Sequence, residues 1–219
     1  MVKFTNLINQ IFPNFTCLAC DCEINVSQYS HVCDACFALL KPAEPTKINA
    51  DTLIKDKARN IHLKHIFAPF IYAPPLSSVV LKLKYADEGL VADLFAPFMK
   101  KVIEGERFDL VIPVPLSKSR RRERGFNQAE LLVQAMGLHS AQIVTRVRKT
   151  APQVDMTDAQ RRENQRDSFE LTSDVKGKRI LIVDDIVTSG ATTNEIARIL
   201  KKAGASHVSA LAIACTNKI

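Results

Sequence analysis

Two adjacent carboxylates and the hydroxyl-rich turn after them have the residue types and spacing needed for chemistry. The carboxylates are Asp184 and Asp185, and they directly follow the apolar run 180–183. The turn 188–192 comes next and contains Gly190. Backbone N–H groups at a helix start form a ready anion site, and glycine lets the backbone approach a ligand closely. The turn is therefore predicted to hold a monophosphate.

The two carboxylates lie about one sugar's length from that turn, where they can accept hydrogen bonds from two ribose hydroxyls. Adjacent side chains on a strand point to opposite faces, so the chain must turn for both acids to reach one ligand. The arrangement suggests a pentose 5-phosphate. The catalytic candidates are Asp184 and Asp185, and the phosphate-binding candidates are Thr188, Ser189, Gly190, Ala191 and Thr192. The alternative is an ordinary strand, turn and helix with surface acids.

Four cysteines near the start of the chain have the spacing of a metal site. Cys17 and Cys20 form one CxxC pair, and Cys33 and Cys36 form another, with twelve residues between the pairs. Two such pairs present four thiolates to one tetrahedral Zn²⁺, and a shell of four protein ligands makes the zinc structural. Disulfides, a redox CxxC, and ligation by Cys22 in place of Cys20 are the alternatives.

The elements that would position these groups alternate between strand and helix. Strands are predicted at residues 66–72, 109–115, 141–147, 179–184 and 207–214, and helices at 76–85, 90–103, 127–136 and 191–203. This alternation predicts an α/β fold with a parallel sheet, in which ligands bind beyond the carboxyl ends of the strands. The predicted domains are a zinc-binding module over 1–42, a linker over 43–65 and the α/β domain over 66–219.

A basic tract follows the strand predicted at 109–115. It spans residues 118–124, of which five are basic. The candidates for pyrophosphate or DNA contact are these basic residues and the three residues before them: Pro115, Leu116, Ser117, Lys118, Arg120, Arg121, Arg122 and Arg124. Guanidinium groups suit bidentate phosphate contacts. The alternative is that these arginines only clamp a pyrophosphate or pair locally with Glu123. Aromatic residues make up 6% of the chain, so any nucleic-acid binding is expected to depend on charge more than on stacking.

The overall charge has the same sign as this tract. The 219-residue chain carries 30 Lys and Arg against 23 Asp and Glu, a net charge of +7, which favours anionic partners. The alternative is that the excess charge only faces water. No segment approaches the roughly 20 apolar residues of a membrane span, and the first fifteen residues lack the pattern of a signal peptide. A cytoplasmic location without a membrane span is therefore expected.

The pattern 180–192 resembles the binding motif for 5-phosphoribosyl 1-diphosphate (PRPP) in type I phosphoribosyltransferases, and residues 111–118 are similar to their pyrophosphate loop. With the four cysteines and the Arg-Glu-Arg-Gly-Phe-Asn-Gln segment 122–128, these motifs resemble the ComF (ComFC/GntX-like) family associated with competence. Stretches 149–153 and 161–164 match the mobile hood of such enzymes. Its candidate residues are Gln153, Arg161 and Asn164.

The resemblance implies a parallel-sheet type I phosphoribosyltransferase-like domain with a small N-terminal four-Cys zinc module. It implies a cytoplasmic protein of natural transformation and DNA uptake that binds single-stranded DNA and PRPP or another ribose 5-phosphate ligand. Structural Zn²⁺, Mg²⁺ with PRPP and other DNA-uptake proteins are the implied cofactors and partners. The family as a class has no established reaction. A catalytically active phosphoribosyltransferase of nucleotide salvage and a PRPP-sensing regulator are the alternatives.

Overall fold

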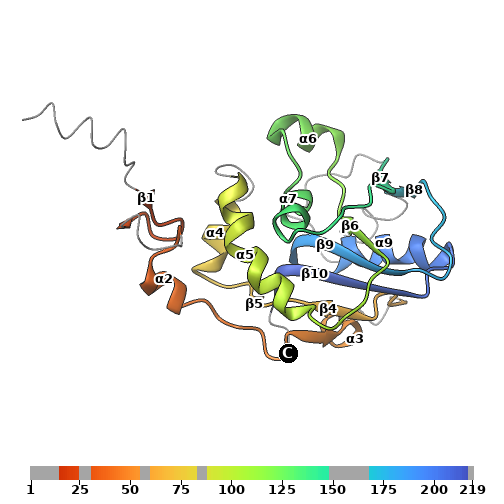
Figure 1. Cartoon of the computed structure of the whole chain (residues 1–219), viewed down its shortest axis with the longest axis horizontal. Helices are drawn as coiled ribbons and strands as arrows, with labels where there is room; N and C mark the ends of the chain where they lie inside the picture. Colours follow the sequence, from red (N-terminus) through yellow and green to blue (C-terminus); the bar gives the residue numbers. More distant parts are fainter. Residues whose placement is uncertain (1–14, 25–30, 55–59, 83–87, 148–167, 217–219) are drawn as a thin grey trace, which may run out of the picture.

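A six-stranded sheet forms the centre of the computed structural model, which describes residues 15–24, 31–54, 60–82, 88–147 and 168–216 (Figure 1). The strand order is β3-β4-β10-β9-β6, and β5 also pairs with β10. Their bounds are β3 Lys47–Asn49, β4 His65–Phe67, β5 Phe70–Ile71, β6 Leu110–Pro113, β9 Arg179–Val187 and β10 His207–Cys215. Only the pairing of β3 with β4 is antiparallel, so the predicted parallel α/β fold is confirmed with one antiparallel edge strand.

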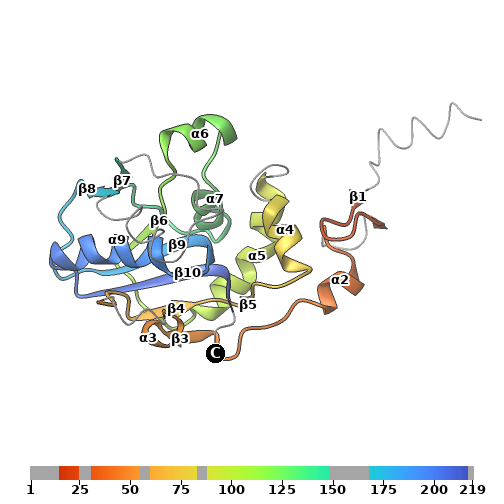
Figure 2. The ribbon, with the colours of Figure 1, turned by 180° about the vertical axis from the view of Figure 1, so that it is seen from behind.

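Helices cover both faces of this sheet. On one face lie α4 (Leu76–Lys82), α5 (Glu88–Val102) and α7 (Gln128–Ala135), and on the other lie α3 (Ala50–Leu53) and α9 (Ala191–Lys202). Alternate residues of β9 divide between the two cores: Leu181 packs with the first group and Ile182 with the second. Figures 1 and 2 show α5 and α9 on opposite sides of the strands. The apolar run of β9 is therefore buried on both faces, as expected for a central parallel strand.

The stretch predicted as a linker contributes to the main sheet. Within residues 43–65, β3 pairs with β4 and α3 packs Leu53 into the second core. The domain boundaries stay predictions, but residues 47–53 act as part of the α/β unit. These elements have only three and four residues, which is too short for a hydrophobic period to show in the sequence.

One predicted strand lies outside the main sheet. Residues Val144–Arg146 form β7, which pairs antiparallel with β8 (Phe169–Leu171) in a separate two-stranded sheet. Along β7 a buried residue, an exposed residue and a half-buried residue follow one another. That alternation suits a strand packed on one face, whereas a central parallel strand is apolar throughout.

The cysteine-bearing segment lies at one end of the molecule, next to α4 and α5 (Figure 2). It contains β1 (Phe15–Thr16), β2 (Glu23–Ile24) and α2 (Asp34–Ala38). The rings of Phe37 and Phe98 lie 5.8 Å apart, and Lys82 Nζ lies 2.7 Å from Asp21 Oδ1. The segment therefore shares one hydrophobic core with α4 and α5. None of the helices in the described ranges has the length and hydropathy needed to cross a membrane.

Candidate functional site

A cavity of about 290 Å³ lies at the carboxyl ends of β6 and β9. It brings together the two acids, part of the turn after β9, the loop after β6 and the start of α7. The lining residues are Tyr72, Val114, Pro115, Leu116, Arg120, Arg124, Asn127, Gln128, Ala129, Arg146, Asp184, Asp185, Ile186, Thr188 and Thr192. The position is the one at which open α/β sheets bind ligands.

The two acids reach the cavity because β9 extends past its neighbour. Strand β6 ends at Pro113, opposite Val183, and β9 continues to Val187. Asp184 and Asp185 therefore lie within the strand, whereas the sequence placed the strand's end at Asp184. Each carboxylate accepts a hydrogen bond from the next backbone amide, Asp184 Oδ1 from N–H 185 at 2.9 Å and Asp185 Oδ1 from N–H 186 at 2.8 Å. Both half-buried acids line the same opening.

The turn after β9 forms a smaller recess that adjoins this cavity. All five predicted phosphate-binding residues, 188–192, line it, together with Asp184. Asp184, Ile186, Thr188 and Thr192 line both spaces, which makes the two spaces continuous. Helix α9 begins at Ala191, within this stretch, with Gly190 as its N-cap residue at φ 67°. The backbone of this recess thus lies at a helix N-terminus, where an anion is favoured.

Gly190 is required by both its backbone and its surroundings. Its positive φ is strained for other residues, and an added Cβ would lie 2.8 Å from two side-chain carbons of Ile54. We expect Gly190→Ala to destabilise the fold by more than the roughly 1–2 kcal/mol of a left-handed backbone alone. Gly137→Ala is the matched control, because Gly137 has φ 68° and no atom within 4 Å of the added Cβ. Urea unfolding that gives equal losses for the two variants would contradict the proposed contact with Ile54.

Helix α6 (Lys118–Arg124) divides the basic tract between the cavity and the solvent. Arg120 and Arg124, four residues apart, lie on one face and line the cavity. Lys118 and Arg122 are exposed and do not line it. Arg121 pairs with Glu130 at 3.3 Å rather than with Glu123, the partner considered from the sequence.

The loop before α6 is held by its own residues. Pro115 and Leu116 line the cavity, while Ser117 caps α6 by accepting a hydrogen bond from the Arg120 amide at 3.3 Å. The hood candidates Gln153, Arg161 and Asn164 lie outside the described residues.

Asn127 lines the cavity but was not among the sequence candidates. It is 6% exposed, and its Oδ1 accepts a hydrogen bond from the Ala129 amide at 3.1 Å, which caps α7. Its Nδ2 donates to the Val114 carbonyl at 3.1 Å. Asn127 therefore ties the loop after β6 to the start of α7. Its position in the 122–128 segment was visible in the sequence, but this double hydrogen bonding was not.

Arg146 is a second lining residue that the sequence did not indicate. It comes from β7, and its guanidinium lies 5.3 Å from the centroid of the Phe169 ring. Burial lowers the pKa of Arg146, the like charge of Arg120 lowers it further, and Asp184 raises it. Because an arginine in a protein stays protonated, the cavity holds a fixed positive charge near both of these groups.

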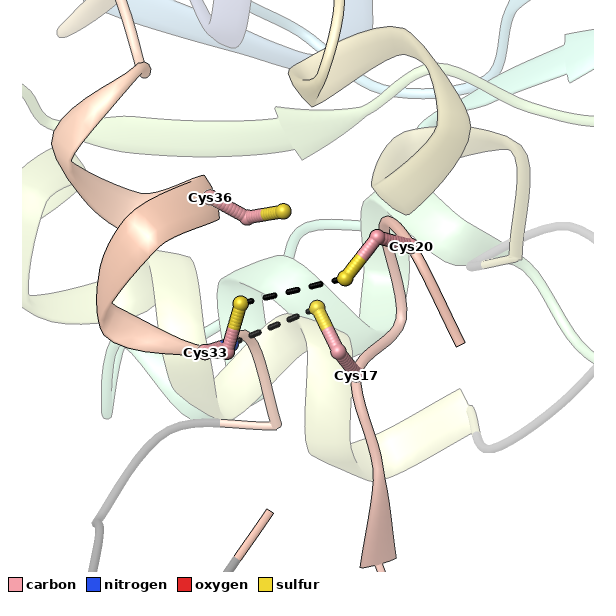
Figure 3. Close-up of side chains that lie close together, drawn as sticks. All are labelled: Cys17, Cys20, Cys33 and Cys36. Atoms are coloured by element: carbon pink, nitrogen blue, oxygen red, sulfur yellow. Dashed lines mark hydrogen bonds between the residues drawn. The ribbon is translucent and has the colours of Figure 1, made fainter. Parts of the chain in front are cut away.

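The four predicted metal ligands come together at the other end of the molecule (Figure 3). The sulfur atoms of Cys17, Cys20, Cys33 and Cys36 all lie within 4.8 Å of one another, so they could hold a metal ion. Cys20 Sγ and Cys33 Sγ are 3.8 Å apart. This convergence is the one that two CxxC turns predict, and the donor set suits Zn²⁺.

The surroundings of Cys17 favour a thiolate. Burial raises the pKa of this thiol, but the amides of Cys33 and Ala19, 3.3 and 3.4 Å from its sulfur, contribute to lowering it to about 6. A thiolate is the form that binds metal. The exposed thiol of Cys22 differs, because its interactions with Cys20 and Cys33 raise its pKa to about 12. Cys22 also lies outside the group of four sulfurs that could hold a metal ion, which agrees with its interpretation as a spare thiol.

Comparisons with known proteins agree with this architecture. The family described as "Phosphoribosyl transferase domain" matches residues 122–218. DNA utilization protein YhgH of Escherichia coli O157:H7 is 37% identical over 149 residues, which are 63% of this chain and 66% of that protein. Competence protein F of Haemophilus influenzae is 30% identical over 152 residues, with the same two shares. Competence protein ComFC of Streptococcus pneumoniae is 26% identical over 198 residues, 88% of this chain and 85% of that protein.

The match thus spans slightly less than two thirds of the length of the first two relatives. The family match over residues 122–218 includes the segment 122–128, the two acids and the predicted phosphate turn. The mostly parallel sheet, the two acids near the carboxyl end of β9 and the four-Cys group were also expected from the sequence. These relatives and the matched domain support a ComF-family protein, and its α/β unit has the type I phosphoribosyltransferase-like fold.

Proposed function

We propose that this ComF-type protein acts in the cytoplasm during DNA uptake, binding PRPP in the cavity and single-stranded DNA along the outer face of α6. One observation carries the PRPP part: the predicted phosphate turn and the two acids line continuous spaces that also contain Arg120 and Arg124. A sugar with a phosphate at one end and a diphosphate at the other matches that order of groups.

In this proposal the 5-phosphate binds at the N-terminus of α9, where the amides and hydroxyls of the turn donate to its oxygens. Asp184 and Asp185 accept hydrogen bonds from the two ribose hydroxyls. Arg120 and Arg124 face the diphosphate, which guanidinium groups bind bidentately. Carboxylate oxygens are suitable Mg²⁺ ligands, so the two acids fit a metal bound with PRPP, which would neutralise part of the diphosphate charge.

An active phosphoribosyltransferase is the second candidate. It is favoured by the three arginines of the cavity, Arg120, Arg124 and Arg146, which could stabilise a leaving diphosphate. Release of pyrophosphate from PRPP in the presence of a nucleobase would identify this activity. PRPP binding without turnover that changes the affinity for a DNA or protein partner would instead identify a PRPP-sensing regulator.

We also propose that the four-Cys group holds one structural Zn²⁺. Four thiolates leave no open coordination position, so the metal stabilises the fold and takes no part in chemistry. The shared core of this segment with α5 means that zinc would support the main body as well as the module.

The DNA part of the proposal is supported by charge and by the names of the relatives. Those names refer to DNA utilization and to competence. Lys118 and Arg122 lie exposed on the side of α6 away from the cavity lining, and the chain carries a net charge of +7. An exposed basic surface of this kind binds the nucleic-acid backbone through counterion release.

The variant Lys118→Gln with Arg122→Gln tests this surface. We expect weaker binding to single-stranded oligonucleotides of any sequence and a salt dependence whose slope falls by about 1.4, because each contact with single-stranded phosphate contributes roughly 0.7. PRPP affinity should not change. Lys100→Gln with Lys101→Gln is the charge-matched control on α5. A salt slope that is the same in both double variants would contradict the DNA assignment.

A further inference from the structure

Gln128 is a buried polar residue of the cavity that the proposed function does not use. It is the first residue of α7, it is 3% exposed, and it lines the cavity. Its Nε2 has no hydrogen-bond partner within the described ranges. A buried amide in this state is unfavourable, and a ligand that offers an acceptor removes the penalty. The side chain thus points to a ligand group with a free lone pair.

The neighbouring side chain holds Gln128 in place. Asn127 uses both ends of its amide inside the protein, on the Ala129 amide and on the Val114 carbonyl. This bonding fixes the start of α7 against the loop after β6. Gln128 therefore begins a helix whose N-terminus is already anchored, and its own amide remains available for a ligand in the cavity.

The charges around Gln128 indicate an anionic acceptor. Arg120, Arg124 and Arg146 line the same cavity as the two carboxylates of β9. Arg120 lies near enough to Arg146 for their like charges to interact unfavourably. An anion bound between guanidinium groups relieves such repulsion, and the positive end of α7 adds to the attraction.

This end of the cavity is separate from the phosphate turn. The recess formed by residues 186–193 includes neither Gln128 nor the cavity arginines. The two spaces share Asp184, Ile186, Thr188 and Thr192 in their linings. One anion position is therefore expected at α9 and a second at α7, in spaces that share Asp184 as a lining residue.

We propose that Gln128 donates a hydrogen bond from Nε2 to a phosphoryl oxygen of a diphosphate group held beside Arg124 and Arg146. Gln128 and Arg146 are then specificity residues that distinguish a diphosphate-bearing sugar from a sugar with a single phosphate. The inference rests on the proposed PRPP site, because it assigns the second end of that site. It does not depend on whether the protein catalyses a reaction.

The experiment uses full-length, zinc-loaded protein and three probes: inorganic pyrophosphate, ribose 5-phosphate and PRPP. In Gln128→Met the length is kept and the donor is lost, so pyrophosphate and PRPP should bind about tenfold more weakly, since a hydrogen bond to a charged group is of that order. Ribose 5-phosphate affinity should stay within twofold. Gln128→Glu should weaken pyrophosphate binding more than Gln128→Met. Gln134→Met, an exposed glutamine of the same helix, is the matched control and should bind all three probes normally.

Equal losses of ribose 5-phosphate and pyrophosphate in Gln128→Met would overturn the inference, and so would normal pyrophosphate binding by Gln128→Glu. Wild-type protein that fails to bind pyrophosphate would overturn it too. If pyrophosphate binding depends on Gln128 while ribose 5-phosphate does not bind the wild type, the inference stands and the PRPP proposal fails. The wild-type side-chain amide signals of Gln128, followed by NMR, give a second readout that needs no variant. They should shift with pyrophosphate and stay in place with ribose 5-phosphate.

Discussion

Replacing Asp184 and Asp185 together by alanine should weaken PRPP binding by a hundredfold or more. Each carboxylate is proposed to accept a charge-assisted hydrogen bond from a ribose hydroxyl, and hydrogen bonds to charged groups contribute about 1.5–3 kcal/mol each. Two of them correspond to a factor of about 10² to 10⁴ in affinity. Inorganic pyrophosphate should bind the variant at least as well as the wild type, because the arginines of the cavity then have fewer acidic neighbours. Calorimetric titration measures both affinities.

The control for this variant removes the same two negative charges elsewhere. Asp93 and Glu104 are exposed and do not line the cavity, so Asp93→Asn with Glu104→Gln should bind PRPP normally. Zinc content and thermal stability should be unchanged in both double variants. In a deletion strain, the Asp184/Asp185 variant should fail to restore transformation. Unchanged PRPP affinity would count directly against the assignment of these acids.

Loss of the zinc site is the second large effect that we expect. Cys17→Ser should release the metal, whose apparent binding free energy in zinc-finger peptides is about 10–16 kcal/mol. Because Cys17 belongs to the same core as Phe70 and Phe95, the loss should reach beyond the cysteine segment. We expect the Tm of the whole chain to fall by at least about 10 °C, since 1 kcal/mol corresponds to roughly 2–4 °C at this size and a loss of about 5 kcal/mol is enough for that fall.

Cys22→Ser is the matched control for the zinc prediction. Cys22 is exposed, and it lies outside the group of four sulfurs that could hold a metal. This variant should keep the metal and the wild-type Tm, measured by atomic absorption and thermal unfolding. Metal-free wild-type protein as stable as the zinc-loaded form would contradict a structural role. Loss of metal from Cys22→Ser would place Cys22 among the ligands.

The parts of the site that could be predicted are those encoded by neighbouring residues. The acids and the turn 188–192 form one continuous stretch, so their order alone indicated an anion site after a buried strand. The CxxC pairs are equally local. Helix α6 lacks an apolar stripe and was not predicted as a helix. The residue types at its two ends are nevertheless typical of helix boundaries, since Ser117 caps its start and Gly125, at φ 80°, ends it.

The rest of the site depends on tertiary contacts. Tyr72, Gln128 and Arg146 line one cavity although they come from β5, α7 and β7 regions far apart in the chain. Nothing in the local sequence of Arg146 distinguishes it from an exposed arginine on a short strand. The same holds for Ile54, whose contact with Gly190 joins the predicted linker to the phosphate turn.

A crystal structure of the protein with PRPP bound tests the central claim most directly. We predict the 5-phosphate on the amides of residues 188–192, the ribose hydroxyls on Asp184 and Asp185, and the diphosphate toward Arg124 and Gln128. A complex in which this cavity is empty while PRPP binds elsewhere, or in which the ligand makes no contact with the turn, would contradict the account.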